Sequence, residues 1–164
     1  MDSAQEIVKI TLIGFGATGV MDIWLSFLKR IGVQTLNFAF IGRWVGHVFF
    51  GRFSHAAIVK APPIAHEALL GWVTHYVVGI VFAFLLIGVA GIEWIGKPSP
   101  GLAILVGICT VVFPFFVMQP AMGLGIAFSK TPNPIKSCAR SLINHSVFGL
   151  GLYLSAVLIE ALSR

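Results

Sequence analysis

Five polar side chains lie inside otherwise apolar stretches of the chain and could do chemistry there. They are Asp22, His75, Gln119, Asn144 and His145. A charge at the middle of a membrane helix costs about 2.5–3.5 kcal/mol on insertion scales, so such groups normally face protein or water. Asp22 lies seven residues before Lys29 and His75 eight residues after Glu67, which on a helix means depths of about 10 and 12 Å. We therefore predict one polar layer that contains all five side chains.

Small residues recur on the same helical faces as these polar groups. Gly14 and Thr18 precede Asp22 at intervals of four, Gly71 and Gly79 flank His75, and Gly149 follows His145. Small residues at every fourth position mark faces where membrane helices touch closely. These side chains should therefore point into a helix bundle. Pro120, directly after Gln119, predicts a kink in its helix.

The polar layer has three interpretations that the residues leave open. His75, His145 and Asp22 could hold a transition metal, and the two histidines could be axial ligands of haem. The same groups, with Gln119 and Asn144, could bind a solute or relay protons. They could also bond only to one another and hold the helices in register.

The long connection after the first apolar stretch carries its own candidate residues. Arg43 and Arg52 lie among aromatic residues and are predicted to bind lipid headgroups. His47 and His55 are eight residues apart, which on one helix means about 12 Å and is too far for a shared metal ion. We therefore expect these two histidines to lie separately at the headgroup interface.

Familiar enzyme signatures are missing from the sequence. It contains no G-x-S-x-G, no H-E-x-x-H and no Walker lysine loop. Residues 14–19 match G-x-G-x-x-G, but they lie within an apolar helix and not after a strand, so close helix packing is the simpler role. The sequence thus argues against an enzyme without excluding one.

Composition indicates the elements that position these residues. The 164 residues are 57% hydrophobic and only 10% charged, whereas a soluble domain carries about 25% charged residues. About 20 apolar residues are needed for each membrane crossing. We predict an all-α, four-helix transmembrane bundle that forms a single domain over residues 1–164. The predicted helices are 8–29, 68–92, 99–128 and 138–162, with an interfacial segment at 35–60 between the first two.

Basic residues predict the orientation of this bundle. The N-terminus, second loop and C-terminus hold three Lys and Arg residues, whereas the first and third loops hold eight. The positive-inside rule then places both termini outside and the two basic loops in the cytoplasm. The net charge of +5 is explained by this role and by anionic lipid, so no nucleic-acid partner is expected.

The two halves of the chain also share a pattern. His75 begins the sequence His-x-Val-x-Gly-aliphatic, and His145 begins the same sequence in the last predicted helix. Val20-Met21-Asp22 similarly resembles Val117-Met118-Gln119. This suggests two parallel helical-hairpin repeats related by an axis along the membrane normal.

Several short motifs resemble one known family. They include Ala17-Thr18-Gly19-Val20-Met21-Asp22-Ile23-Trp24, Gly71-Trp72-Val73-Thr74-His75-Tyr76 and Met118-Gln119-Pro120-Ala121-Met122-Gly123. Gly42-Arg43-Trp44-Val45-Gly46-His47 and Ser141-Leu142-Ile143-Asn144-His145 belong to the same set. Together they resemble a bacterial integral membrane family, domain of unknown function 2938. The resemblance implies a multi-pass protein of the bacterial inner membrane, but no activity or cofactor.

The sequence therefore predicts a small multi-pass membrane protein whose polar layer binds a small solute or ion or passes it with protons. A single four-helix unit has little room for a pore, so a homo-oligomer is expected. A haem- or metal-binding redox or sensor protein and a structural accessory subunit are the alternatives.

Overall fold

The computed structural model describes residues 3–163, and within that range it contains helices and turns but no strand. The α-helices are α1 (Ser3–Arg30), α2 (Phe38–Phe49), α3 (Glu67–Ala90), α4 (Pro100–Cys109), α5 (Gln119–Met122) and α6 (Pro134–Leu162). Shorter helical turns are η1 (Ile58–Lys60), η2 (Ile92–Gly96), the π-helical η3 (Pro114–Met118) and η4 (Ile126–Phe128). The all-α prediction is confirmed.

Four helical stretches are long and apolar enough to cross a membrane. They are Ser3–Arg30, Glu67–Ala90, Pro100–Met122 and Pro134–Leu162. Each overlaps a predicted span, and α2 occupies part of the predicted interfacial segment. The four helices indicate a multi-pass membrane protein, because their apolar lengths match what a bilayer requires.

The third stretch is the one that departs from its prediction. It ends at Met122 and not near residue 128, because Gly123 and Gly125 take positive φ angles of 88° and 76°. Gln119 keeps helical angles of −69° and −44°, and the turn before Pro120 is the π-helical η3, so the kink at Pro120 stays a prediction. The α-helix of this stretch ends earlier, at Cys109 with Thr110 as its cap, and the chain returns to α-helix at Gln119 after the π-helical η3. Pro114 lacks the N–H that would bond back to the preceding turn.

Helix ends follow ordinary capping chemistry. At the end of α1, Val33 N–H bonds to Leu28 O at 2.9 Å and Gly32 N–H to Lys29 O at 3.2 Å. Gly32 has a φ of 80°, so this end is a Schellman motif. Helix α2 starts where the Asn37 side chain accepts the N–H of Ala39.

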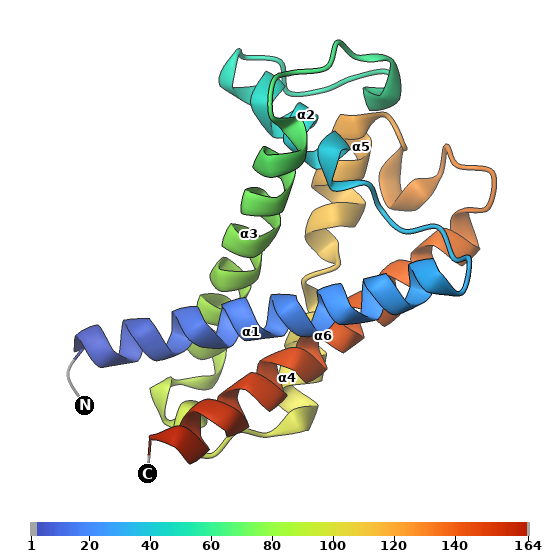
Figure 1. Cartoon of the computed structure of the whole chain (residues 1–164). Coiled ribbons are helices and arrows are strands. Elements are labelled where there is room, and N and C mark those ends of the chain that lie inside the picture. Colours follow the sequence, from blue (N-terminus) through green and yellow to red (C-terminus); the bar gives the residue numbers. More distant parts are fainter. Residues whose placement is uncertain (1–2, 164) are drawn as a thin grey trace. The chain divides into compact units, whose positions relative to one another are not determined.

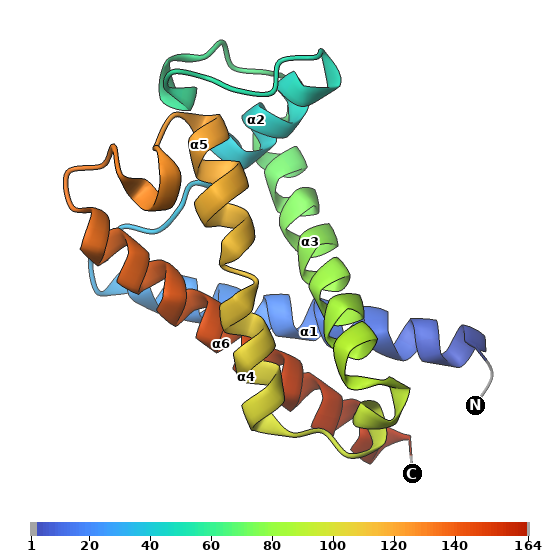
Figure 2. The ribbon, with the colours of Figure 1, turned by 180° about the vertical axis from the view of Figure 1, so that it is seen from behind.

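The chain divides into two compact units, which are described separately. The first contains Met1–Thr35, Tyr76–Thr110 and Ile143–Arg164, and the second contains Leu36–His75 and Val111–Leu142. The core of the first unit is aliphatic, with Ile13, Leu86 and Leu152 among its most buried side chains. In this unit α1 and the C-terminal part of α6 lie side by side (Figure 1), and α4 lies on α6 (Figure 2).

Glycines make the helix contacts of the first unit close. A Cβ atom at Gly14 of α1 would lie 2.6 Å from the Cα of Ile80 in α3, and one at Gly107 of α4 would lie 2.6 Å from the Cα of Gly149 in α6. Gly151 of α6 meets the backbone of Ala17 in α1 in the same way. The packing role predicted for Gly14 and Gly149 is therefore confirmed.

The second unit is built on a similar close crossing. Gly42 of α2 faces the backbone of Glu67 and Gly71 at the start of α3, leaving no room for a side chain. Ile58 and Ala61 of the loop that joins these helices form a small core with Met122 of α5. This crossing fixes the position of the long connection that follows α2.

The four candidate spans expose most of their surface. Only 22–33% of each apolar window is buried, and side chains such as Ile23 and Leu158 face outward. Apolar side chains on all faces of a helix require lipid or protein around them. The single domain and the internal repeat stay predictions.

Candidate functional site

Asp22 of α1 is held by a tyrosine of α3 in the first unit. The Tyr76 hydroxyl donates a hydrogen bond of 2.8 Å to Oδ2 of Asp22. Thr18 and Gly14, one and two turns earlier on α1, pack on α3 near Gly79, so the face predicted for Asp22 is the one that meets α3. A carboxylate inside a candidate membrane span is thus placed against a neighbouring helix.

Asn144 and His145 of α6 bond to two different helices in the same unit. The indole N–H of Trp24 in α1 donates to Oδ1 of Asn144 at 2.9 Å. Nδ1 of His145 lies 2.7 Å from the hydroxyl oxygen of Thr110, directly after α4. The Thr110 hydroxyl also donates to Gly107 O at 2.6 Å, so His145 Nδ1–H donates to Thr110 in the arrangement that satisfies both groups. These two residues therefore connect α6 to α1 and α4.

His75 and Gln119 belong to the second unit. The ring of His75 packs on Phe38, with centroids 4.5 Å apart, and on Trp72 at 6.0 Å. The Gln119 side chain is only 2% exposed, and its Oε1 is buried without a hydrogen-bond partner. The five predicted site residues are thus divided between the two units, and a single layer of all five stays a prediction.

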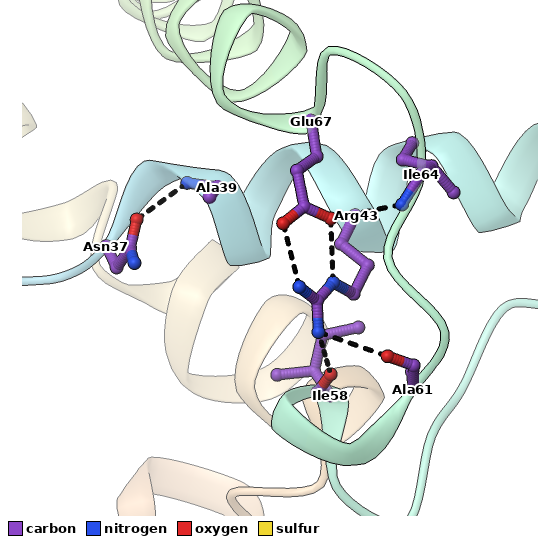
Figure 3. Close-up of polar contacts among 7 residues, drawn as sticks. All are labelled: Asn37, Ala39, Arg43, Ile58, Ala61, Ile64 and Glu67. Atoms are coloured by element: carbon purple, nitrogen blue, oxygen red, sulfur yellow. Dashed lines mark hydrogen bonds and ion pairs between the residues drawn. The ribbon is translucent and has the colours of Figure 1, made fainter.

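Arg43 forms the strongest polar network of the second unit (Figure 3). Its Nη2 and Nε donate to the two carboxylate oxygens of Glu67 at 2.7 and 2.8 Å, while Nη1 donates to the carbonyls of Ile58 and Ala61 at 3.3 and 3.1 Å. Hydrogen bonding to Glu67 raises the pKa of Arg43. This guanidinium therefore fixes the loop between α2 and α3. The side chain of Arg52 is exposed and could reach a lipid headgroup. The lipid-headgroup role of the two arginines stays a prediction.

His47 and His55 meet, contrary to the expectation that they lie apart. Nδ1 of His47 lies 2.7 Å from Nε2 of His55, and the two side chains are 9% and 6% exposed. The 12 Å expectation assumed one continuous helix. Helix α2 instead ends at Phe49, and Gly51 has a φ of 76°, so the chain reverses and brings His55 back.

The second ring nitrogen of His55 is also unusual. Its Nδ1 is buried and has no hydrogen-bond partner. Burial lowers the pKa of His55, and the positive charge of Arg52 lowers it further. Burial and the nearby positive charge therefore both favour the neutral imidazole of His55.

No group of three or more His, Cys, Asp or Glu side chains within residues 3–163 is arranged to hold a metal ion. The two cysteines, Cys109 and Cys138, are free thiols. The sites that this part of the chain offers are accordingly pairs of polar side chains, not a complete metal centre.

Comparison with known proteins places these side chains in one family. The profile described as "Protein of unknown function (DUF2938)" matches residues 11–159. The chain belongs to the DUF2938 family. No curated protein and no solved structure is significantly similar to it. The match includes all the candidate site residues named above, so the resemblance seen in the sequence motifs is confirmed.

Membership in DUF2938 carries no activity with it. Function must therefore be argued from the residues themselves. Sequence reasoning identified Asp22, Asn144 and His145 but missed their partners Tyr76, Trp24 and Thr110. Only Tyr76 could have been found by position, since it is adjacent to His75 on a face next to the small-residue stripe.

Proposed function

We propose that this protein passes protons, together with a small solute or ion, across the bacterial inner membrane. The observation that carries the proposal is the contact between Asp22 and Tyr76 within two candidate membrane spans. An ionisable side chain at this depth is costly unless it serves a function or is fully paired. Proton exchange at its carboxyl group would give Asp22 such a function.

The chemistry of the pair suits reversible protonation. Oδ2 of Asp22 accepts the Tyr76 hydroxyl hydrogen at 2.8 Å. A carboxylate is stabilised by such a donor, whereas a protonated carboxyl group can itself donate to a neighbour or a water. The contact thus couples the charge state of Asp22 to the packing of α1 on α3. This coupling is what proton-linked passage requires of a membrane helix pair.

The orientation and assembly of the protein form part of the same proposal. Lys29 and Arg30 at the end of α1, with the other basic loop residues, support a cytoplasmic position for that end and both termini outside. The large exposed apolar faces of the spans support contact with lipid and with a second copy of the chain. A homo-oligomer would supply the space that one chain lacks for a solute path.

A structural accessory role is the second candidate, and a specific observation favours it. Asp22, Asn144 and His145 all bond to polar groups of neighbouring helices. Cross-helix bonds of this kind hold membrane helices in register without any transport. For the haem- or metal-binding interpretation of His75, His145 and Asp22, residues 3–163 contain no group of three or more His, Cys, Asp or Glu side chains that could hold a metal ion.

Asp22→Asn separates transport from the structural role. Asn keeps an oxygen that accepts the Tyr76 hydroxyl, but it cannot exchange a proton. In proteoliposomes with an imposed membrane potential and an internal pH dye, we expect Asp22→Asn to reduce proton flux by about tenfold or more. Tyr76→Phe should reduce it less, because the carboxyl group remains.

The matched control is Trp24→Phe. It removes the bond to Asn144 from the same helix, yet removes no titratable group. Its flux should equal that of the unsubstituted chain. Equal proton flux in Asp22→Asn and in the parent would reject proton passage through Asp22. If the parent shows no proton flux, and Asp22→Asn and Trp24→Phe both have a lower thermal stability, the accessory role is favoured.

A further inference from the structure

The end of α2 and the loop after it expose large aromatic side chains that lie outside the four candidate membrane spans. Phe49, Phe50 and Phe53 are 78%, 85% and 65% exposed, and Arg52 among them is exposed as well. An apolar patch of this kind on a folded surface marks contact with a membrane or with another protein. We call residues 49–53 the aromatic loop.

Hydrogen bonds hold the aromatic loop against α2. The indole N–H of Trp44 donates to Phe53 O at 3.0 Å, and the backbone N–H of Arg52 donates to His47 O at 3.0 Å. The buried rings of His47 and His55 hydrogen-bond to each other, with 2.7 Å between their nitrogens. The turn is therefore fixed by its own contacts, and its aromatic rings remain exposed.

The aromatic loop is also tied to the end of a candidate membrane span. The stretch Glu67–Ala90 is long and apolar enough to cross a bilayer. Arg43 of α2 forms an ion pair of 2.7 Å with Glu67, at the first residue of this stretch (Figure 3). Gly42 packs directly on the backbone of Glu67 and Gly71. A helix that enters the bilayer at Glu67 has the headgroup region at this end, so α2 and the aromatic loop lie there.

The charges of the chain are concentrated in the same unit. The second unit holds six Lys and Arg residues and one acidic residue, whereas the first holds five of each, so the net charge of +5 belongs to the second unit. Its one acidic residue, Glu67, is paired with Arg43. Arg52 and Lys60 are both exposed, and Lys60 follows Val59, which is 59% exposed. Apolar and basic side chains thus alternate along this segment, as in protein segments that lie on anionic membranes.

We propose that the aromatic loop, with Lys60, binds the anionic phospholipid surface of the leaflet at this end of α3. Arg52 and Lys60 contact lipid phosphates, and the rings of Phe49, Phe50 and Phe53 lie among the headgroups. Guanidinium groups bind phosphate through paired N–H donors. Charge complementarity favours this occupant over a second copy of the chain, because a copy would present the same positive charge.

The first test is native mass spectrometry of the purified full-length chain in a neutral detergent. The chain is titrated with phosphatidylglycerol or with phosphatidylcholine that has the same acyl chains. We expect the parent to retain phosphatidylglycerol preferentially. Arg52→Gln and Lys60→Gln should each lower this preference by about fivefold, since each basic residue near an anionic surface contributes that much to affinity.

The matched control is Lys97→Gln. Lys97 is an exposed lysine of the first unit and lies four residues after Glu93. Its loss removes one positive charge from the chain, as Arg52→Gln does, but leaves the proposed surface intact. The lipid preference of Lys97→Gln should therefore equal that of the parent. A decrease as large as that of Arg52→Gln would show that only the total charge matters and would overturn the proposal.

The second test measures insertion of the aromatic loop. Phe50→Trp adds an indole at the most exposed of the three Phe positions, and the difference from the parent spectrum isolates its fluorescence. In vesicles of brominated phosphatidylglycerol we expect quenching of this indole, and in unbrominated vesicles we expect protection from acrylamide. Circular dichroism checks that each variant folds as the parent does.

Four results would overturn the proposal. They are equal retention of the two lipids by the parent, an added indole that acrylamide quenches and brominated lipid does not, and displacement of the lipid by millimolar inorganic phosphate at constant ionic strength. The fourth is a Phe50→Ser variant that changes the oligomeric state without changing lipid retention, which would assign the surface to a second copy. Asp22 and Tyr76 are unchanged in all these variants, so the outcome is independent of proton passage.

Discussion

Arg43→Met is expected to lower the free energy of unfolding by about 3 kcal/mol. The side chains of Arg43 and Glu67 are only 11% and 18% exposed. Removing the guanidinium leaves a poorly hydrated carboxylate without its cation and releases the carbonyls of Ile58 and Ala61. Thermal unfolding in detergent, followed by circular dichroism, measures the change. Limited proteolysis should show earlier cleavage between residues 51 and 66.

Two further arginine variants make this result specific. Arg52→Met changes an exposed arginine of the same segment and should stay within about 0.5 kcal/mol of the parent. Arg43→Lys keeps the charge but cannot make the paired contact with Glu67, so its stability should lie between those of the parent and Arg43→Met. Equal unfolding of Arg43→Met and Arg52→Met would show that the ion pair contributes no net stability.

Gly14→Leu is expected to destabilise the first unit by about 3 kcal/mol, at the upper end of the usual overpacking cost. A Cβ atom at Gly14 would already lie 2.6 Å from Ile80 Cα and 2.9 Å from Gly79 O. Backbone atoms cannot rotate away, so α1 and α3 would have to separate and the bond between Asp22 and Tyr76 would lengthen. Reversible unfolding in mixed micelles is the measurement.

Gly19→Leu in the same helix is the control. No atom lies within 4 Å of a Cβ placed at Gly19, and replacing a helical glycine removes a helix-propensity cost of about 1 kcal/mol. Its stability should equal or exceed that of the parent. If both glycine variants are equally destabilised, close contact at Gly14 is not the cause.

Local patterns in the sequence were sufficient to predict the four membrane-spanning helices and the helix faces that pack on one another. Runs of apolar residues located the four helices, and intervals of four residues located Gly14, Thr18 and Gly149 at helix contacts. Both signals depend on periodicity within one helix. Asp22, Asn144 and His145 were found on the same basis, as polar residues in apolar surroundings.

Contacts between distant segments could not be found in this way. The bond from Trp24 to Asn144 joins residues 120 positions apart, and no local pattern encodes such a pairing. The distance between His47 and His55 was wrongly predicted, because the chain reverses at Gly51 through a single positive φ angle that the sequence pattern does not reveal. Arg43 was expected at lipid headgroups, whereas its principal partner is a carboxylate 24 positions away.

The small buried share of the four spans has a practical consequence. When only 22–33% of an apolar window is covered by the protein itself, acyl chains or detergent tails provide the remaining solvation. The molecule that can be purified is thus a particle of polypeptide and amphiphile together. Its melting behaviour should change with the chain length of the surfactant, even when the polypeptide is unchanged.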